Sequence, residues 1–143
     1  KFNFKKEPLE KYTLKVLSGA MKDYLEHEND SLTFVLETKN ISEYGNLTVN
    51  LQNVEKFPVI VELTNTKGDI IASHYSESTT KIDFFLLEPN LFTLRVIYDD
   101  NKNREWDSGN FLEKKQAEKV IYFPKEIDVR ANWDVEQSFN LKP

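Results

Sequence analysis

Apolar and polar residues alternate along most of the chain with a period of two. Such alternation is typical of a β-strand that buries one face and exposes the other. Tyr12, Leu14 and Val16 give the first example. Similar alternation, or a short run of apolar residues, predicts further strands over 32–38, 47–51, 59–63, 69–75, 82–86, 94–98, 118–123 and 126–133.

Turn signals separate several of these segments. Asn65-Thr66-Lys67-Gly68 predicts a hairpin turn, because Gly68 is free to adopt a positive φ. Glu88-Pro89-Asn90 predicts another, with Pro89 presetting φ and Asn90 tolerating the left-handed region. Helix is expected only as a short stretch over 18–25, capped by Ser18, and as a weaker candidate over 111–118. The pattern therefore predicts an all-β chain, an antiparallel β-sandwich with little helix.

A polar run near residues 39–44 predicts a boundary between two parts, 1–42 and 43–143. The first part has too few strands to close a sandwich. We expect it to be the end of a preceding domain or an ordered appendage on the second part. The chain begins at Lys1 without a methionine or a signal segment, so we expect it to derive from a longer protein.

Composition narrows the classes of function. The chain has 143 residues, of which 39% are hydrophobic and 30% charged, and these values favour a packed core over disorder. Its net charge is −5 with the signs mixed, so nucleic acid is not an expected partner. Cysteine is absent, which removes disulfides, thiolate metal sites and cysteine nucleophiles. A cysteine-free, all-β secreted chain fits a bacterial surface protein.

The candidate chemistry lies in one segment rich in Asp and Asn. Oxygen-bearing side chains recur at Asp99, Asn101 and Asn103, and a fourth follows at Asp107. This spacing suits a Ca²⁺ loop, in which successive oxygens turn inward. It also suits a structural turn in which Asn and Asp side chains bind their own backbone. The structural turn is favoured, because the sixth position of a Ca²⁺ loop calls for Gly and the twelfth for Glu, whereas this chain has Arg104 and Asn110.

Other candidate sites are weaker. His27 and His74 are far apart in sequence, and a zinc site would need three or four converging ligands. The chain has no nucleophile elbow, no phosphate-binding glycine loop and no zinc-protease helix motif. Three segments starting at Asn29, Asn40 and Asn46 match the N-glycosylation acceptor pattern, which is incidental in a bacterial protein.

Two parts of the chain resemble known families. In 12–38, a strand leads into Ser18-Gly19-Ala20, then Asp23, and a second strand closes the segment. This resembles the last strands of the Ig-like domain first described in S-layer proteins. In the second part, Gly45 opens a strand and Leu87-Glu88-Pro89-Asn90-Leu91-Phe92 leads into the Asp/Asn segment. This resembles the transthyretin-like sandwich of carboxypeptidase regulatory domains and collagen-adhesin B-type repeats.

With the ending 126–134, nearly the whole chain is similar to the C-terminal region of Bacteroidota "Ig-like domain-containing" lipoproteins. The resemblance implies an N-terminal lipid anchor outside this chain, a place at the outer membrane and a non-enzymatic role. Asp30-Ser31-Leu32 then resembles the O-glycosylation motif of surface Bacteroidota proteins, with Ser31 as acceptor.

We therefore expect a non-enzymatic interaction or scaffolding module of an outer-membrane lipoprotein, docking onto a larger outer-membrane assembly. Its partners would be other outer-membrane or surface proteins, on the cell surface or the periplasmic side. The alternative is a carbohydrate- or peptide-binding sandwich assisted by Ca²⁺. A hydrolase with paired carboxylates ranks last, because no pair is singled out among the many Asp and Glu residues.

Overall fold

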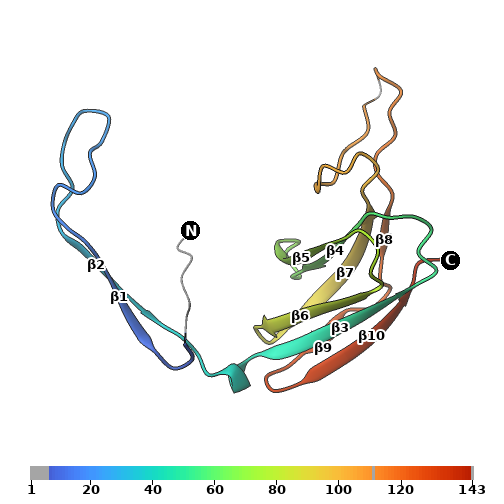
Figure 1. Ribbon diagram of the computed structural model, residues 1–143, viewed down its shortest axis with the longest axis horizontal. Coiled ribbons are helices and arrows are strands. Elements are labelled where there is room, and N and C mark those ends of the chain that lie inside the picture. The colour runs from blue at the N-terminus through green and yellow to red at the C-terminus, as the bar shows by residue number, and fades with distance from the viewer. Residues whose placement is uncertain (1–6, 111, 143) are drawn as a thin grey trace. The chain divides into compact units, whose positions relative to one another are not determined.

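The chain divides into two compact units, Lys1–Ile41 and Ser42–Pro143, in a computed structural model that describes residues 7–110 and 112–142. The regular structure of these residues is β, apart from the three-residue 3-10 turn Ile41–Glu43 (Figure 1). The predicted all-β class is therefore confirmed. The described residues contain no helix that could cross a membrane.

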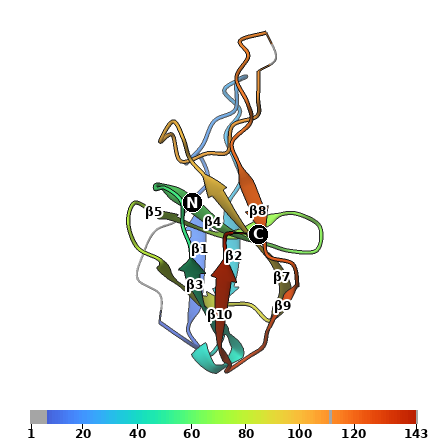
Figure 2. The same ribbon diagram turned by 90° about the vertical axis from the view of Figure 1, so that its right-hand side faces the viewer.

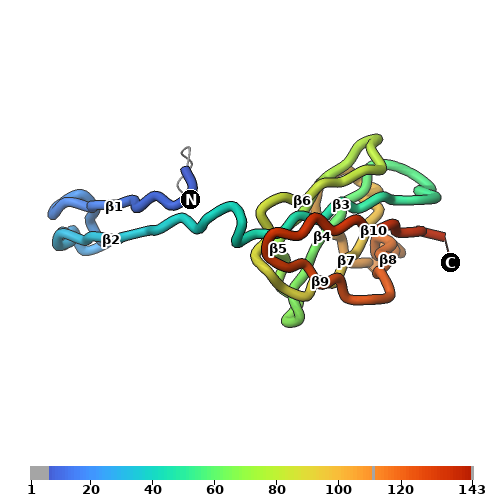
Figure 3. Tube along the Cα trace, turned by 90° about the horizontal axis from the view of Figure 1, so that it is seen from below, coloured from blue at the N-terminus to red at the C-terminus, as the bar shows by residue number. Residues whose placement is uncertain are grey.

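Unit 1 is a single antiparallel hairpin. Its strands β1 (Lys11–Val16) and β2 (Leu32–Glu37) run side by side, as Figure 3 shows. The expected helix over 18–25 is wrong, because this segment belongs to the hairpin's long tip. Asp23 accepts hydrogen bonds from the backbone N–H groups of Leu25 and His27 there, at 2.8 and 2.9 Å. Such local bonds compete with the helical hydrogen-bond ladder.

Unit 2 is a β-sandwich whose two sheets are drawn in Figure 1. Its strands are β3 (Gly45–Gln52), β4 (Val59–Thr64), β5 (Ile70–Ser76), β6 (Lys81–Leu87), β7 (Asn90–Tyr98), β8 (Val120–Tyr122), β9 (Ile127–Val129) and β10 (Asp134–Asn140). The order β10-β3-β6 makes one sheet and β5-β4-β7-β8 the other, with β9 paired to the first residues of β7.

The sandwich is not entirely antiparallel. β10 pairs with β3 in parallel from Asp134↔Asn46 to Asn140↔Gln52, and the two arrows point the same way in Figure 2. A parallel pair needs a long crossover connection, and here the rest of the sandwich, from β4 to β9, supplies it. The sequence pattern missed β10, because its inward positions are Val135, Gln137 and Phe139, and Gln137 interrupts the apolar alternation.

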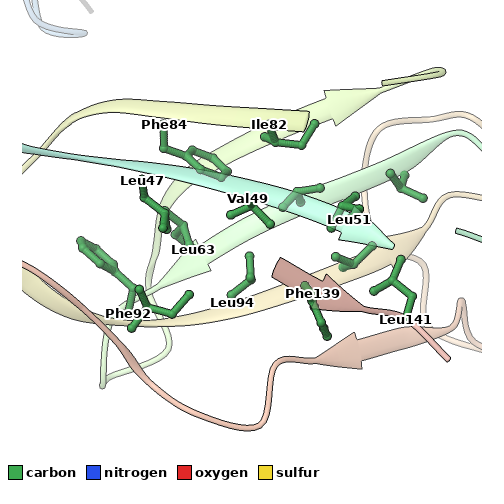
Figure 4. Close-up of a cluster of buried hydrophobic side chains, with 14 of the residues drawn as sticks. Leu47, Val49, Leu51, Leu63, Ile82, Phe84, Phe92, Leu94, Phe139 and Leu141 are labelled. Atoms are coloured by element: carbon green, nitrogen blue, oxygen red, sulfur yellow. The ribbon is translucent and has the colours of Figure 1, made fainter. Parts of the chain in front are cut away.

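The core lies between the two sheets, where inward side chains of the strands meet (Figure 4). Alternate residues of β3 and β6, namely Leu47, Val49, Ile82 and Phe84, face those of β4 and β7. All six residues of β4 are buried, as expected for a central strand. The remaining core residues include Leu51, Val59, Val61, Leu63, Phe92, Leu94, Val96, Tyr98, Phe139 and Leu141.

Two segments differ from their predicted structure. Residues 112–118 form turns and an isolated bridge between Asn110 and Lys115 rather than a helix, and position 111 of that prediction lies outside the described residues. The predicted strand over 126–133 is limited to Ile127–Val129, after which the chain turns into β10. Asn132 has a positive φ of 59° in that turn, which ends the strand.

Candidate functional site

The Asp/Asn loop begins where β7 leaves the core. Tyr98, the last residue of β7, is fully buried, and Asp99 directly after it is only 2% exposed. The ammonium groups of Lys56 and Lys119 lie over the Tyr98 ring, 5.8 and 5.4 Å from its centroid. Lys56 also forms an ion pair with Asp100. The start of the loop is therefore fixed to the connection between β3 and β4.

Carboxylate and amide oxygens of the loop bind its own backbone. Asp99 accepts the N–H groups of Asn103 and Arg104 at 3.2 and 2.9 Å. Asn101 Oδ1 also accepts the N–H of Asn103, at 3.1 Å, and Asn103 Oδ1 accepts that of Glu105 at 2.8 Å. The two bonds to Asn101 and Asn103 are successive Asx turns, and all four bonds satisfy polar groups that a long loop otherwise leaves open.

The structure brings the four predicted ligand residues into one network. The side-chain amides of Asn101 and Asn103 both donate to Asp107 Oδ2, the second at 2.7 Å. Asp99 contacts the same stretch through the backbone, as described above. In this arrangement, Asp107 Oδ2 accepts hydrogen bonds from the side-chain N–H groups of Asn101 and Asn103. A bound cation would instead need the amide oxygens of these two residues turned toward it. Within the described ranges, no three His, Cys, Asp or Glu side chains are grouped to hold a metal ion.

Glu118 is a member of the network that the sequence pattern did not reveal. Its carboxylate accepts the N–H groups of Asp100 and Asp107, at 2.8 and 3.1 Å, and the residue is 7% exposed. Its backbone carbonyl accepts the indole N–H of Trp106 at 3.3 Å. Glu118 therefore holds both sides of the loop together. It lies 11 residues after Asp107 in a segment that reads as an ordinary strand, so sequence spacing carries no signal for it.

Arg104 points its charge at an aromatic ring of the neighbouring sheet edge. Its guanidinium carbon lies 4.7 Å from the centroid of the Tyr75 ring on β5, a cation–π distance. Arg104 also has a positive φ of 69°, the backbone conformation for which a Ca²⁺ loop uses Gly. Burial, and then the charges of Asp99 and Glu77, raise the pKa of Tyr75, and Arg104 opposes that shift.

A cavity of about 330 Å³ lies beside the loop. Its lining residues are Phe57, Pro58, Tyr75, Glu77 and Lys102. They combine two aromatic rings, a carboxylate and an ammonium group, which is the mixture found in sites for small polar ligands.

The remaining sequence candidates lie elsewhere. Ser31 is exposed and directly precedes β2. His27 Nδ1 lies 3.1 Å from Asp23 Oδ2 at the exposed hairpin tip, whereas His74 is on β5, so the two histidines belong to different units.

On the outer face of the larger sheet, Arg95 pairs with Glu62 at 2.7 Å, and its guanidinium is 3.5 Å from the Tyr122 hydroxyl.

Edge strands β5 and β6 carry large exposed side chains that strand alternation alone does not explain. The pairing of each strand shifts by one residue, between Leu63 and Thr64 for β5 and between Gly45 and Leu47 for β6. Each shift is a β-bulge, which re-aims side chains. The pairs Ile70–Ile71 and Phe85–Leu86 lie at these bulges and are exposed by 53% and 47% and by 69% and 53%.

Comparison with known proteins adds no further identification. The sequence matches no model of a protein family and no curated protein.

Proposed function

We propose that this chain is a non-enzymatic interaction module of a bacterial outer-membrane lipoprotein, docking as a subunit onto a larger outer-membrane assembly. The observation that carries the proposal is the two bulged pairs, Ile70–Ile71 and Phe85–Leu86, which are exposed on edge strands of both sheets. We call these four residues the bulge pairs. Burying exposed apolar side chains is the main driving force of protein association.

The exposed position of the second pair is built into the local backbone. Phe84 is buried opposite Leu47, so Phe85 points to the outer face. Leu86 then takes a positive φ of 54°, and its N–H donates to Asn46 Oδ1 at 3.1 Å. A positive φ is costly for a non-glycine residue, and such strain is concentrated at functional positions. This favours a selected contact surface over an accidental one.

Partner class and location follow from the resemblance to Bacteroidota lipoproteins. The partners are other outer-membrane or surface proteins, and the membrane is reached through a lipid anchor that lies outside this chain. The net charge of −5 agrees with a protein partner, because a nucleic acid would call for clustered basic residues.

The test is chemical cross-linking of the intact lipoprotein in its own membranes, comparing two variants. Phe85→Ser removes an apolar side chain from the bulge pairs, and Leu112→Ser removes one that is 92% exposed elsewhere in unit 2. We expect one defined outer-membrane protein to be cross-linked to the wild type and to Leu112→Ser, and to be lost from Phe85→Ser. A set of cross-links that is the same for both variants would overturn the proposal.

A second candidate function is Ca²⁺-assisted binding of a carbohydrate or peptide. One observation favours it: Arg104 adopts the positive φ required at the sixth position of a Ca²⁺ loop, and its guanidinium lies on Tyr75. Calorimetry with Ca²⁺ tests it, using Asp107→Ala as the variant and Asp69→Ala as the control on another turn. Heat of binding that Asp107→Ala abolishes would support this function, and no Ca²⁺-dependent heat in the wild type would exclude it.

A further inference from the structure

Strand β5 is an edge of the larger sheet: it pairs with β4 on one side and with no described strand on the other. The direction of its backbone groups follows from a hydrogen bond at the start of β4. The N–H of Asp99 donates to the carbonyl of Pro58, so Pro58 bonds toward β7. Because this direction alternates from residue to residue in an antiparallel strand, Val59 and Val61 bond toward β5.

The backbone groups of two β5 residues point away from the sheet. The register partners of Val59 and Val61 are Ser76 and His74, which therefore bond back to β4. Ser73 and Tyr75 alternate with these residues, and no backbone hydrogen bond joins them to a described residue on the open side. Unpaired N–H and C=O groups at alternate residues of an edge are a template for an added strand.

Among the seven-residue edge strands, β5 is the one without a charged side chain. It contains no Lys, Arg, Asp or Glu. At the edges of the smaller sheet, β6 carries Lys81 and Asp83, and β10 carries Asp134 and Glu136. Charged side chains protect an edge against strand addition. The open side of β5 is therefore the edge best suited to receive a strand.

The cavity beside the Asp/Asn loop adjoins this edge. Val61 belongs to the core, so its neighbour Ile60 points to the outer face of the sheet. Tyr75 is opposite Ile60 and shares that face. A residue of an added strand beside Tyr75 would place its side chain on the same face, next to the cavity. The cavity is lined by Phe57, Pro58, Tyr75, Glu77 and Lys102.

The lining of the cavity fits one uncharged aromatic side chain. Its volume of about 330 Å³ is at the lower end of the range for ligand pockets, roughly 300–1,000 Å³, which suits a single large side chain. The carboxylate of Glu77 and the ammonium group of Lys102 have opposite charges, so the lining residues carry no net charge. The rings of Phe57 and Tyr75 offer the edge and face contacts that aromatic pairs prefer.

A second copy of β5 does not meet these requirements. Tyr75 is the only aromatic residue of β5, and its ring is already held by Arg104 of the same chain, whose guanidinium carbon is 4.7 Å from the ring centroid. The other large apolar side chains of β5, Ile70 and Ile71, lie at the bulge, where the pairing is irregular. The occupant that fits is therefore a segment of another protein.

We infer that the open edge of β5 and the adjoining cavity form one binding site for an extended segment of another protein. The segment adds to β5 as a strand, bonds to the backbone of Ser73 and Tyr75, and places an uncharged aromatic side chain in the cavity. The inference deepens the proposed function and rests on it for the class of partner, since β5 also carries the bulge pair Ile70–Ile71.

Short linear peptides selected from a phage-displayed library on the 143-residue chain test the inference. Ser73→Pro and Lys81→Pro are matched variants, because each removes an N–H that points away from its sheet and breaks no bond within it. For Lys81, this direction follows from its neighbour Thr80, whose carbonyl accepts the N–H of Leu51 on β3.

We expect the selected peptides to share an aromatic residue and to bind the wild type and Lys81→Pro with equal affinity in calorimetry. Ser73→Pro should bind them at least about tenfold more weakly, because it lacks a donor that the added strand needs. Hydrogen exchange gives a second measurement that requires no variant. Bound peptide should slow the exchange of the Ser73 and Tyr75 amides at least about tenfold and leave that of Asp83 on β6 unchanged.

Three results would overturn the inference. The first is a selection that enriches no peptide. The second is equal affinity of the selected peptides for Ser73→Pro and the wild type, with no slower exchange at Ser73 and Tyr75. The third is a concentration-dependent dimer of the chain that Ser73→Pro dissociates, since a second copy would then occupy the edge.

The outcomes also separate this inference from the proposed function. Peptide binding as expected, together with a lipoprotein that is free of any assembly in its native membranes, would contradict the proposed function alone. An assembly that Phe85→Ser loses, together with a selection that enriches no peptide, would overturn the strand-addition site alone.

Discussion

At the scale of single residues, two glycines illustrate how the sandwich restricts its sequence in different ways. Gly45 starts β3 where the chain passes close to β9. A Cβ at this position would collide with the Arg130 carbonyl oxygen and lie 2.6 Å from Val129 Cγ1. Gly68 has open space around it but a positive φ of 87°. The first glycine is required by packing and the second by backbone conformation.

Gly45→Ala is therefore expected to lower the free energy of unfolding by about 1–3 kcal/mol, the usual cost of overpacking. Gly68→Asn is the control, because Asn tolerates the left-handed region, and it should stay within about 0.5 kcal/mol of the wild type. Urea unfolding followed by tryptophan fluorescence measures both. Equal losses for the two variants would contradict the packing account of Gly45.

Asp23 at the hairpin tip has a pKa below its ordinary value. The main cause is the backbone N–H of His27, while partial desolvation works in the other direction and the His27 ring and the Leu25 N–H add to the lowering. A lowered pKa in the folded state means that the ionised carboxylate stabilises the tip. That stabilisation is complete above the unfolded-state pKa of about 3.9 and is lost as the pH falls through the lower folded value.

We expect an NMR titration of the Asp23 carboxyl carbon to give a midpoint below about 3.9, the ordinary value for an aspartate. Amides of Leu25 and His27 should shift with the same midpoint, because they donate to this carboxylate. A midpoint at or above about 3.9 would contradict the hydrogen bonding described for the tip.

At the scale of elements, the Asp/Asn loop depends on Glu118, which binds the N–H groups of Asp100 and Asp107. Glu118→Ala is expected to remove the charged acceptor from these two part-buried N–H groups, at a cost of about 1–3 kcal/mol. Because the bonds are local to the loop, hydrogen exchange should accelerate over 99–107 and the Trp106 emission should shift to the red, while the exchange of β4 stays the same. Glu113→Ala, in the turn 110–115, is the control and should change neither signal.

A comparison of the strands shows which parts of the fold the sequence pattern predicts. Alternation correctly predicted the central strands, such as β3 and β4, because each buries one complete row of apolar side chains. It failed at β10, where Gln137 occupies an inward position, and over 18–25, where Asp23 bonds to the local backbone. Pairing in parallel between β10 and β3 was also not predictable, since it depends on the path of the whole chain.

The candidate sites follow the same division. The sequence singled out Asp99, Asn101, Asn103 and Asp107 because their spacing is local, and in the structure they share one hydrogen-bond network. It did not reveal Glu118 or the bulge pairs. The bonds from Glu118 to the loop and the register shift at a bulge both depend on how neighbouring segments pair in space. Asn90 also differs from its prediction, because it begins β7, and the left-handed residue nearby is Leu86.

At the scale of the whole molecule, the two units differ in how they satisfy their apolar residues. Unit 2 encloses a core between two sheets and leaves the bulge pairs exposed on its edge strands. Unit 1 is a hairpin in which none of the described residues is buried.

The most direct test of the proposed docking function is the size of the particle that carries this protein after its native membranes are dissolved in a mild detergent. We expect the wild type and Leu112→Ser to elute in size-exclusion chromatography with an assembly much larger than the lipoprotein itself. Phe85→Ser should elute as the free lipoprotein, with its fold intact by circular dichroism. Elution of the wild type as a free monomer, or of Phe85→Ser with the large assembly, would contradict the account.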